Sequence, residues 1–283
     1  MSLNSVNTNI GAMIALQSLN KTANALSMVQ KQISTGYRVA DATDDGAAYA
    51  VAQRVRSDVS SLTSANQQLG NVKGLISTTI SGLNDVSTSM QSLRDVLVKL
   101  ADGNTIGNQR TQYTAQYKSL LANVKSFIQD AGYSGKTLIG NITGSAGSFG
   151  KVAVVRNEQA ATYGIATFGG SALYGSIAFG ATTFASATLS AAAITATGTF
   201  ISALNTLGSQ LNGYGAASKY VDNQITYNND KIDSLNSGLG SLIDADLAKE
   251  SAQLQSLQIR QQLGTQSLSI ANQAPQTLLS LFK

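Results

Sequence analysis

The sequence predicts a mainly α-helical protein: long antiparallel coiled-coil or bundled rods, paired terminal helices and a small β-hairpin-rich outer excursion. Three observations predict this fold. Pro275 is the only proline among 283 residues, so almost nothing interrupts helices. Apolar residues repeat with coiled-coil spacing along two long stretches, one in each half of the chain. Charged residues make up only 12% of the chain, which suits protein contacts better than free solvation.

The first rod follows from an apolar series in steps of seven: Ala48, Val55, Leu62, Leu69, Ile76, Leu83, Met90 and Leu97. A helix of about 50 residues is roughly 80 Å long, so we expect a rod that is packed along its length.

A second seam alternates steps of three and four from Leu204 to Leu242. Two seams far apart in sequence indicate an antiparallel or bundled coiled coil. Between the two rods, Tyr113, Tyr117, Leu120, Val124 and Phe127 predict a shorter third helix, which Gly132 would cap.

Residues 138–200 are rich in Gly, Thr and aromatic residues at short intervals, which is typical of hairpins and turns. The repeated Phe-Gly and Tyr-Gly pairs also allow a low-complexity interpretation. We favour a small β-rich segment that emerges from the bundle.

The two chain ends are apolar and nearly uncharged. An N-terminal helix is expected to run to about Thr35 and stop at Gly36, and a C-terminal amphipathic helix follows the second rod. Burying about ten apolar side chains yields about 20 kcal/mol at best, and ordering about 35 residues costs as much or more. Each end is therefore expected to fold only against its mate and neighbouring subunits. The predicted polymer-core residues are Leu3, Val6, Ile10, Met13, Leu254, Leu257, Leu263, Leu268, Leu278, Leu279, Leu281 and Phe282.

These elements divide the chain into nested segments. We expect residues 1–36 and 246–283 to form the terminal helices, residues 37–47 a connecting bend, residues 48–137 and 201–245 the helical bundle, and residues 138–200 a short β-rich surface segment.

Composition excludes several kinds of chemistry. Without His or Cys the chain has no ordinary zinc site, Ser-His-Asp triad or Cys-His pair, so no enzyme activity, metal or cofactor is expected. The net charge is +4, and the basic residues are spread singly along the chain. Their dispersal argues against nucleic-acid binding. No cleavable signal and no stretch long enough to insert into a membrane is visible.

Two local motifs are better explained structurally. Residues 132–137 read GYSGKT, but a phosphate-binding loop needs four residues between its first Gly and Gly-Lys-Thr, and that place falls to Asp130. Asp41, Asp44 and Asp45 lack the alternating spacing of a calcium loop. We expect Asp44 or Asp45 to cap the first rod and to pair with Arg38 or Arg54.

Both ends resemble bacterial flagellin. The N-terminal signature comprises LNSVNTNIGAMIALQSLN followed by ISTGYRVADATDDGAAYAVAQRVRSDV, and the C-terminal one is DADLAKESAQLQSLQIRQQLGTQSLSIANQAPQTLLSLFK. The match covers roughly residues 2–140 and 200–283.

The resemblance implies a subunit that polymerises with itself into the extracellular flagellar filament and gives swimming motility. It implies an inner tube of terminal helices, an outer tube of rods, and a bend of Arg38, Asp41, Asp44 and Asp45 between them. It also implies secretion in an unfolded state through the flagellar type III export apparatus, a flagellin export chaperone on the C-terminal segment, and contact with filament cap and hook-filament junction proteins.

The resemblance further aligns Gln91, Leu93, Arg94 and Asp95 with a segment that an innate immune receptor reads in some flagellins. This chain lacks one Arg of the strongly recognised versions and has Asp in place of Glu, so weak or absent recognition is expected. Two alternative functions remain open: a hook-filament junction protein, and a flagellin-like surface adhesin or glycan-binding protein.

Overall fold

The computed structural model describes residues 8–280, with side chains as far as residue 273. Within that range the chain is mainly helical, as predicted. The elements are α1 (Ile10–Thr35), α2 (Gly46–Ala101), α3 (Gly107–Asp130), β1 (Gly132–Tyr133), β2 (Lys136–Thr137), β3 (Ser148–Phe149), β4 (Val152–Val155), β5 (Thr162–Ile165), α4 (Gly170–Ile177), α5 (Ala181–Ala185), α6 (Ala187–Ala193), α7 (Thr199–Ile243) and α8 (Leu247–Ser280).

The chain forms two compact units. One contains both chain ends, Met1–Ser57 and Asp233–Lys283, and the other is the continuous stretch Asp58–Ile232. The boundaries fall inside the two longest helices, α2 and α7.

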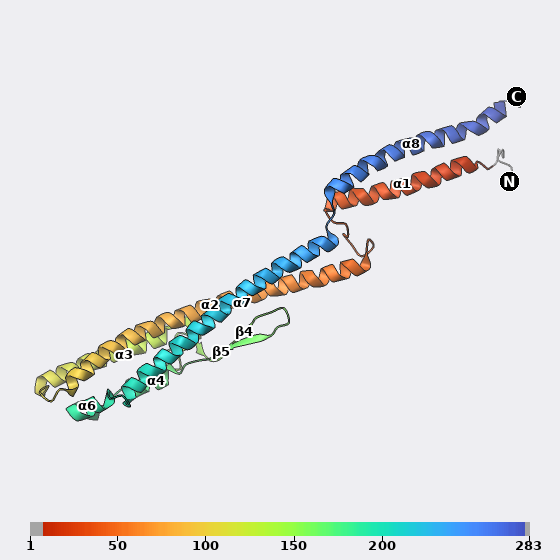
Figure 1. The fold of residues 1–283 in the computed structure, drawn as a ribbon. Coiled ribbons are helices and arrows are strands. Elements are labelled where there is room, and N and C mark those ends of the chain that lie inside the picture. The colour runs from red at the N-terminus through yellow and green to blue at the C-terminus, as the bar shows by residue number, and fades with distance from the viewer. Residues whose placement is uncertain (1–7, 281–283) are drawn as a thin grey trace. The chain divides into compact units, whose positions relative to one another are not determined.

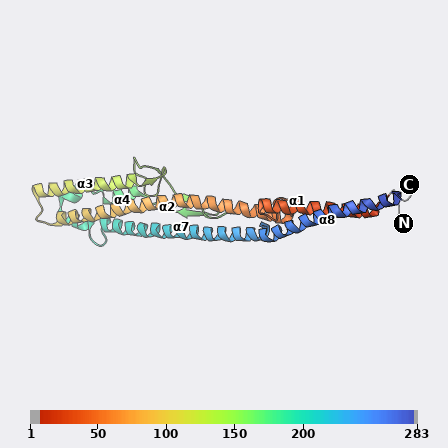
Figure 2. The ribbon, with the colours of Figure 1, turned by 90° about the horizontal axis from the view of Figure 1, so that it is seen from above.

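The central unit has one continuous apolar core. The heptad series predicted for the first rod supplies its axis, since Leu62, Leu69, Ile76, Leu83 and Met90 are all wholly buried. Helix α3 lies alongside α2 (Figure 2) and adds residues such as Tyr117 and Val124 to this core. Burial raises the pKa of Tyr117, whose hydroxyl donates to the carbonyl oxygen of Ile177 at 2.7 Å.

The third helix is longer than its aromatic positions indicated, and it ends at Asp130, with Ala131 as its C-cap residue in place of Gly132. Gly132 instead begins strand β1. Strands β1 and β2 pair antiparallel, β2 pairs with β3 in parallel, and β4 and β5 form a four-residue antiparallel hairpin.

The β-rich prediction for residues 138–200 is wrong for the second half of that segment. Strands end at Ile165, and α4, α5 and α6 follow. The cause is packing: Leu173 and Ile177 lie four residues apart on α4 and are both buried in the core, as is Phe184 of α5. Much of this segment is therefore part of the folded core and not a surface excursion.

Candidate polymerisation surface

Helices α1 and α8 lie side by side and antiparallel (Figure 1), because residues near the start of α1 meet residues near the end of α8. The Asn9 side chain donates to the carbonyl oxygen of Ala271 at 2.8 Å. Further along, a Cβ on Gly264 would lie 3.2 Å from Leu19 Cδ1. The absence of a side chain at Gly264 therefore allows the two helices to approach closely.

The less exposed positions of both helices follow heptad spacing, as expected for a two-helix seam. The positions with this spacing are Ala12, Ala15, Leu19, Thr22, Leu26, Val29 and Ile33 on α1, and Glu250, Leu254, Leu257, Gln261, Gly264, Leu268 and Ala271 on α8. Ala23, Ala25, Lys31 and Gln32 of α1 are less exposed as well. Of these, only Val29 and Leu257 are buried within the unit, at 3% and 7% exposure. The pair of helices thus forms a thin seam that leaves most of each helix uncovered.

Large apolar side chains occupy the uncovered faces. The exposed fractions are 63% for Met13, 62% for Ile14, 62% for Leu263 and 59% for Ile270. Ile10, Leu16, Met28 and Ile259 are exposed as well. Large exposed apolar side chains at this density along a helix are typical of a surface that another protein covers. We call these eight residues the apolar stripes of α1 and α8.

The residues predicted for the polymer core fall into three groups. Ile10, Met13 and Leu263 belong to the apolar stripes, whereas Leu254, Leu257 and Leu268 face the seam inside the chain. The remaining six lie outside the residues whose side chains are described: Leu3, Val6, Leu278, Leu279, Leu281 and Phe282. Sequence reasoning omitted Ile14, Leu16, Met28, Ile259 and Ile270, although their helical spacing from the named residues was the available signal.

The connecting bend is closed by a lysine that sequence reasoning did not name. Lys31 Nζ lies 2.6 Å from Asp41 Oδ2 and 2.9 Å from Asp44 Oδ1. Asp44 also accepts from the main-chain N–H groups of Ala40 and Asp41. The hydrogen bonds from Lys31 lower the pKa of both carboxyl groups, and these carboxylates raise the pKa of Lys31. The expected pairing of the acidic group with Arg38 or Arg54 is therefore corrected to Lys31.

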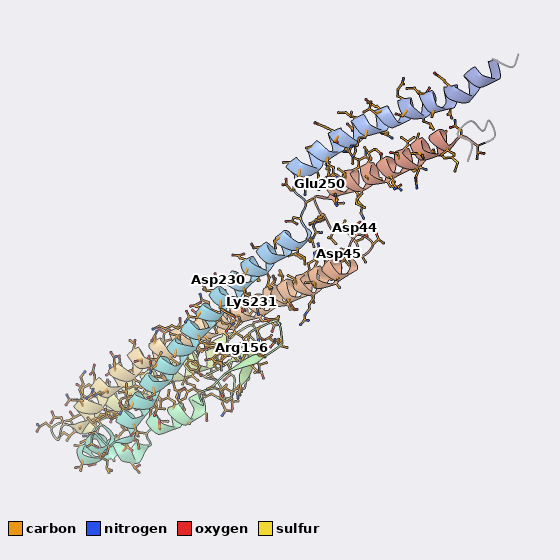
Figure 3. The ribbon with its side chains drawn as sticks, turned by 45° about the vertical axis from the view of Figure 1, so that its right-hand side comes forward. Asp44, Asp45, Arg156, Asp230, Lys231 and Glu250 are labelled. Atoms are coloured by element: carbon orange, nitrogen blue, oxygen red, sulfur yellow. The ribbon has the colours of Figure 1, made fainter. Side chains whose placement is uncertain are left out.

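Asp45, which is one of the two residues expected to cap the first rod, caps α2. Its Oδ1 accepts from the N–H groups of Ala47 and Ala48 at 3.0 Å each. Arg38 Nη2 donates to the carbonyl oxygen of Leu242 at the end of α7, and its main-chain N–H donates to that of Ile243. Figure 3 labels Asp44 and Asp45 at this bend, which lies entirely within the unit of the chain ends.

The segment aligned with the innate-receptor site lies near the C-terminal end of α2, within the central unit. Gln91, Arg94 and Asp95 are exposed on α2, and Leu93 is wholly buried. Leu93 therefore supports the core of the central unit.

Among residues 8–280, no group of three or more His, Cys, Asp or Glu side chains is placed to hold a metal ion. None of the helices in this range combines the length and the apolarity of a membrane span.

Comparison with known proteins identifies both ends of the chain. Residues 6–143 match the family model described as the bacterial flagellin N-terminal helical region, and residues 194–282 match the bacterial flagellin C-terminal helical region. Flagellin FljK of Caulobacter vibrioides is 34% identical over 283 residues, which is 100% of both chains. A flagellin of Brucella melitensis is 32% identical over 291 aligned positions and 99% of each chain. A putative flagellar hook-associated protein of Vibrio parahaemolyticus superposes with a TM-score of 0.55 at 15% identity, covering 71% of this chain and 100% of its own, and supports the fold alone.

Proposed function

The chain belongs to the bacterial flagellin family and is a structural subunit of the flagellar filament, and we propose that the apolar stripes of α1 and α8 are the surface through which it polymerises. The observation that carries this proposal is the exposure of large apolar side chains on both terminal helices. Fully burying one such side chain contributes about 1.5–3 kcal/mol. Eight of them in each subunit supply a large driving force once neighbours cover them.

The low charge of these helices supports the same proposal. Lys21 and Lys31 are the only charged residues of α1, and Lys249, Glu250 and Arg260 the only ones of α8. Few ionised groups need to lose water when the stripes are covered, so burial of the apolar surface is opposed by little desolvation.

Segment roles follow from this surface. Residues 1–36 and 246–283 form the inner tube of the filament, the bend at 37–47 connects it outward, and residues 48–137 with 201–245 form the outer tube. Residues 138–200 are the variable segment, with its second half packed into the bundle. A glycan-binding or adhesive role of this segment is the second candidate.

The subunit is secreted to the cell exterior unfolded through the flagellar type III export apparatus, with an export chaperone on the C-terminal helix and contacts to the cap and hook-filament junction proteins. Full-length relatives named flagellin favour this role over the junction protein, because the hook-associated likeness is limited to the fold. We expect no catalytic role, because a chain without His or Cys has no ordinary zinc site, Ser-His-Asp triad or Cys-His pair. Innate-receptor recognition through Gln91, Arg94 and Asp95 is weak or absent.

Seeded polymerisation of purified protein tests the proposal. Ile14→Asp combined with Leu263→Asp places two carboxylates in the stripes without touching the seam. We expect filament growth on seeds to stop at concentrations at which the wild type elongates. Ile14→Met with Leu263→Met is the matched control and should elongate, because the surface remains apolar. Elongation of the Asp variant at the wild-type rate would overturn the proposal.

A further inference from the structure

Asn228 is a fully buried polar side chain in the apolar seam between α2 and α7 of the central unit. Its exposed fraction is 0%, and its seam neighbours include Val221, which is also wholly buried. Other buried polar side chains, such as Thr79 and Thr137, bond to nearby main chain. Asn228 is different because its amide reaches two segments far away in sequence.

Both the nitrogen and the oxygen of the Asn228 amide have hydrogen-bond partners. Its Nδ2 donates to Asn66 Oδ1 on α2 at 2.8 Å and to the carbonyl oxygen of Arg156 in the β4–β5 turn at 3.0 Å. Its Oδ1 accepts from Gln224 Nε2 at 2.9 Å. Both donor hydrogens are therefore engaged only when α2, α7 and the hairpin are all in place.

We propose that Asn228 sets the register of α2 against α7 and couples this register to docking of the β4–β5 hairpin. A single buried amide in a coiled-coil seam specifies register because a shift leaves it facing apolar groups without partners. The inference concerns the central unit and is independent of the polymerisation surface proposed above.

Two neighbouring contacts between α2 and α7 are consistent with the register that the Asn66–Asn228 hydrogen bond defines. Asn66 Nδ2 donates to Asn229 Oδ1 at 2.8 Å, and Lys73 Nζ lies 2.6 Å from Asp222 Oδ1. A slip by seven residues keeps the heptad pattern of apolar residues in phase, so hydrophobic contacts alone discriminate weakly against it. In the slipped states Asn66 would face Val221 or Leu235, and Asn228 would face Val59 or Lys73.

The hairpin contacts the same face of α7 on both sides of Asn228. The Tyr163 and Tyr220 rings stack with centroids 4.1 Å apart, and Lys231 Nζ lies 2.5 Å from Glu158 Oε1. The side chain of Glu158 is only 13% exposed. Figure 3 labels Arg156 in the β4–β5 turn and Lys231 on α7. These contacts hold the carbonyl of Arg156 within reach of Asn228, which joins hairpin docking to helix register.

Cysteine cross-linking of the full-length monomer tests the proposal, because the chain has no native cysteine. Lys73→Cys is combined with Asp222→Cys to report the native register, and with Asn229→Cys or Gly215→Cys to report slips of seven residues in either direction. Gly215 has open space for a side chain. A short bismaleimide is added, and intramolecular products are identified by peptide mapping.

In the wild-type background we expect cross-links for the native pair. Asn228→Leu should increase the two slipped products by about tenfold or more, while its thermal midpoint stays at or above that of the wild type. Asn223→Leu, the same substitution at an exposed position of α7, is the matched control and should keep the native product alone. Glu158→Gln with Tyr163→Ala, which weakens hairpin docking, should raise the slipped products as well.

If Asn228→Leu gives only the native cross-linked product, Asn228 does not set the register. If the hairpin variant gives the same cross-linked products as the wild type, hairpin docking is not coupled to the register. If Asn228→Leu fails to fold, Asn66→Ala removes the acceptor at a half-exposed position and carries the same expectation.

Discussion

The Nζ atom of Lys31 lies 2.6 Å from Oδ2 of Asp41, so the last turns of α1 are tied directly to the loop that follows. Asp44 shares the same ammonium group at 2.9 Å. All three side chains lie at or near the surface, and the cluster depends on the charge of each group.

The Lys31 cluster predicts a stability contribution that is constant around neutral pH and lost at both extremes. Because the folded-state pKa values of Asp41 and Asp44 are lowered from 3.8, their contribution is present above that value and is lost as the pH falls through the lowered values. Because the pKa of Lys31 is raised from 10.5, its contribution is present below 10.5 and is lost as the pH rises through the raised value.

Lys31→Gln should move the pKa values of both carboxyl groups back towards 3.8, measured by carbon-13 NMR titration of the side-chain carboxyls. Proteolysis within residues 37–47 should increase at pH 7. Lys21→Gln, an exposed substitution on the same helix, should change neither. Carboxyl pKa values that stay at their wild-type positions in Lys31→Gln would contradict this prediction.

The N-cap of α2 predicts a local loss of stability in Asp45→Ala. Removal of the acceptor leaves the N–H groups of Ala47 and Ala48 without their side-chain partner, at a cost of about 1 kcal/mol. Hydrogen exchange at these two amides should accelerate, while amides in the middle of α2 are unaffected. Asp45→Asn should retain most of the protection because Asn is an equally good cap; equal exchange in Asp45→Ala and the wild type would refute the role.

Any side chain added at Gly170, the first residue of α4, is expected to carry a strong packing penalty. A Cβ there would lie 2.2 Å from the carbonyl oxygen of Ile139 and 2.3 Å from Ile128 Cγ2. Gly170→Ala should therefore lower the free energy of unfolding of the central unit by about 3 kcal/mol, measured by urea denaturation. Gly175→Ala on the same helix meets open space and should be neutral or stabilising by up to about 1 kcal/mol. Equal stability of the two variants would show that the contact relaxes without cost.

The helical architecture was predictable because heptad spacing depends on local sequence alone. Leu62, Leu69 and Ile76 were assigned to a seam and are wholly buried. The helical second half of residues 138–200 was missed because its Gly-rich pairs are typical of turns. Leu173 and Ile177 are held in a short helix by contact with the core, which a local pattern does not encode.

The candidate surface was predictable only in part for a related reason. Apolar residues of α8 lie both in the seam and opposite it, so composition alone could not separate Leu257 from Leu263. The position of the partner helix makes this distinction. Lys31 was missed because its acceptors lie across a bend, beyond the spacing at which helical ion pairs are recognised.

The guanidinium of Arg110 joins three segments of the central unit. It donates to the carbonyl oxygens of Leu100, Thr105 and Phe184 at 2.8, 2.8 and 2.9 Å. These acceptors belong to the end of α2, the following loop and α5, so the planar fork of the side chain fixes their relative positions.

Arg110→Lys keeps the positive charge but presents a single ammonium group that cannot reach all three acceptors. We expect the free energy of unfolding to fall by about 2 kcal/mol, because partly buried carbonyls lose their donors. Urea denaturation followed by circular dichroism measures the change, and hydrogen exchange should localise it to the α2–α3 loop and α5. Lys118→Arg exchanges the same two residue types at an exposed site of α3. Its free energy of unfolding should stay within about 0.5 kcal/mol of the wild-type value. If Arg110→Lys is as stable as Lys118→Arg, the charge of Arg110 and not its three-way hydrogen bonding is what the fold requires.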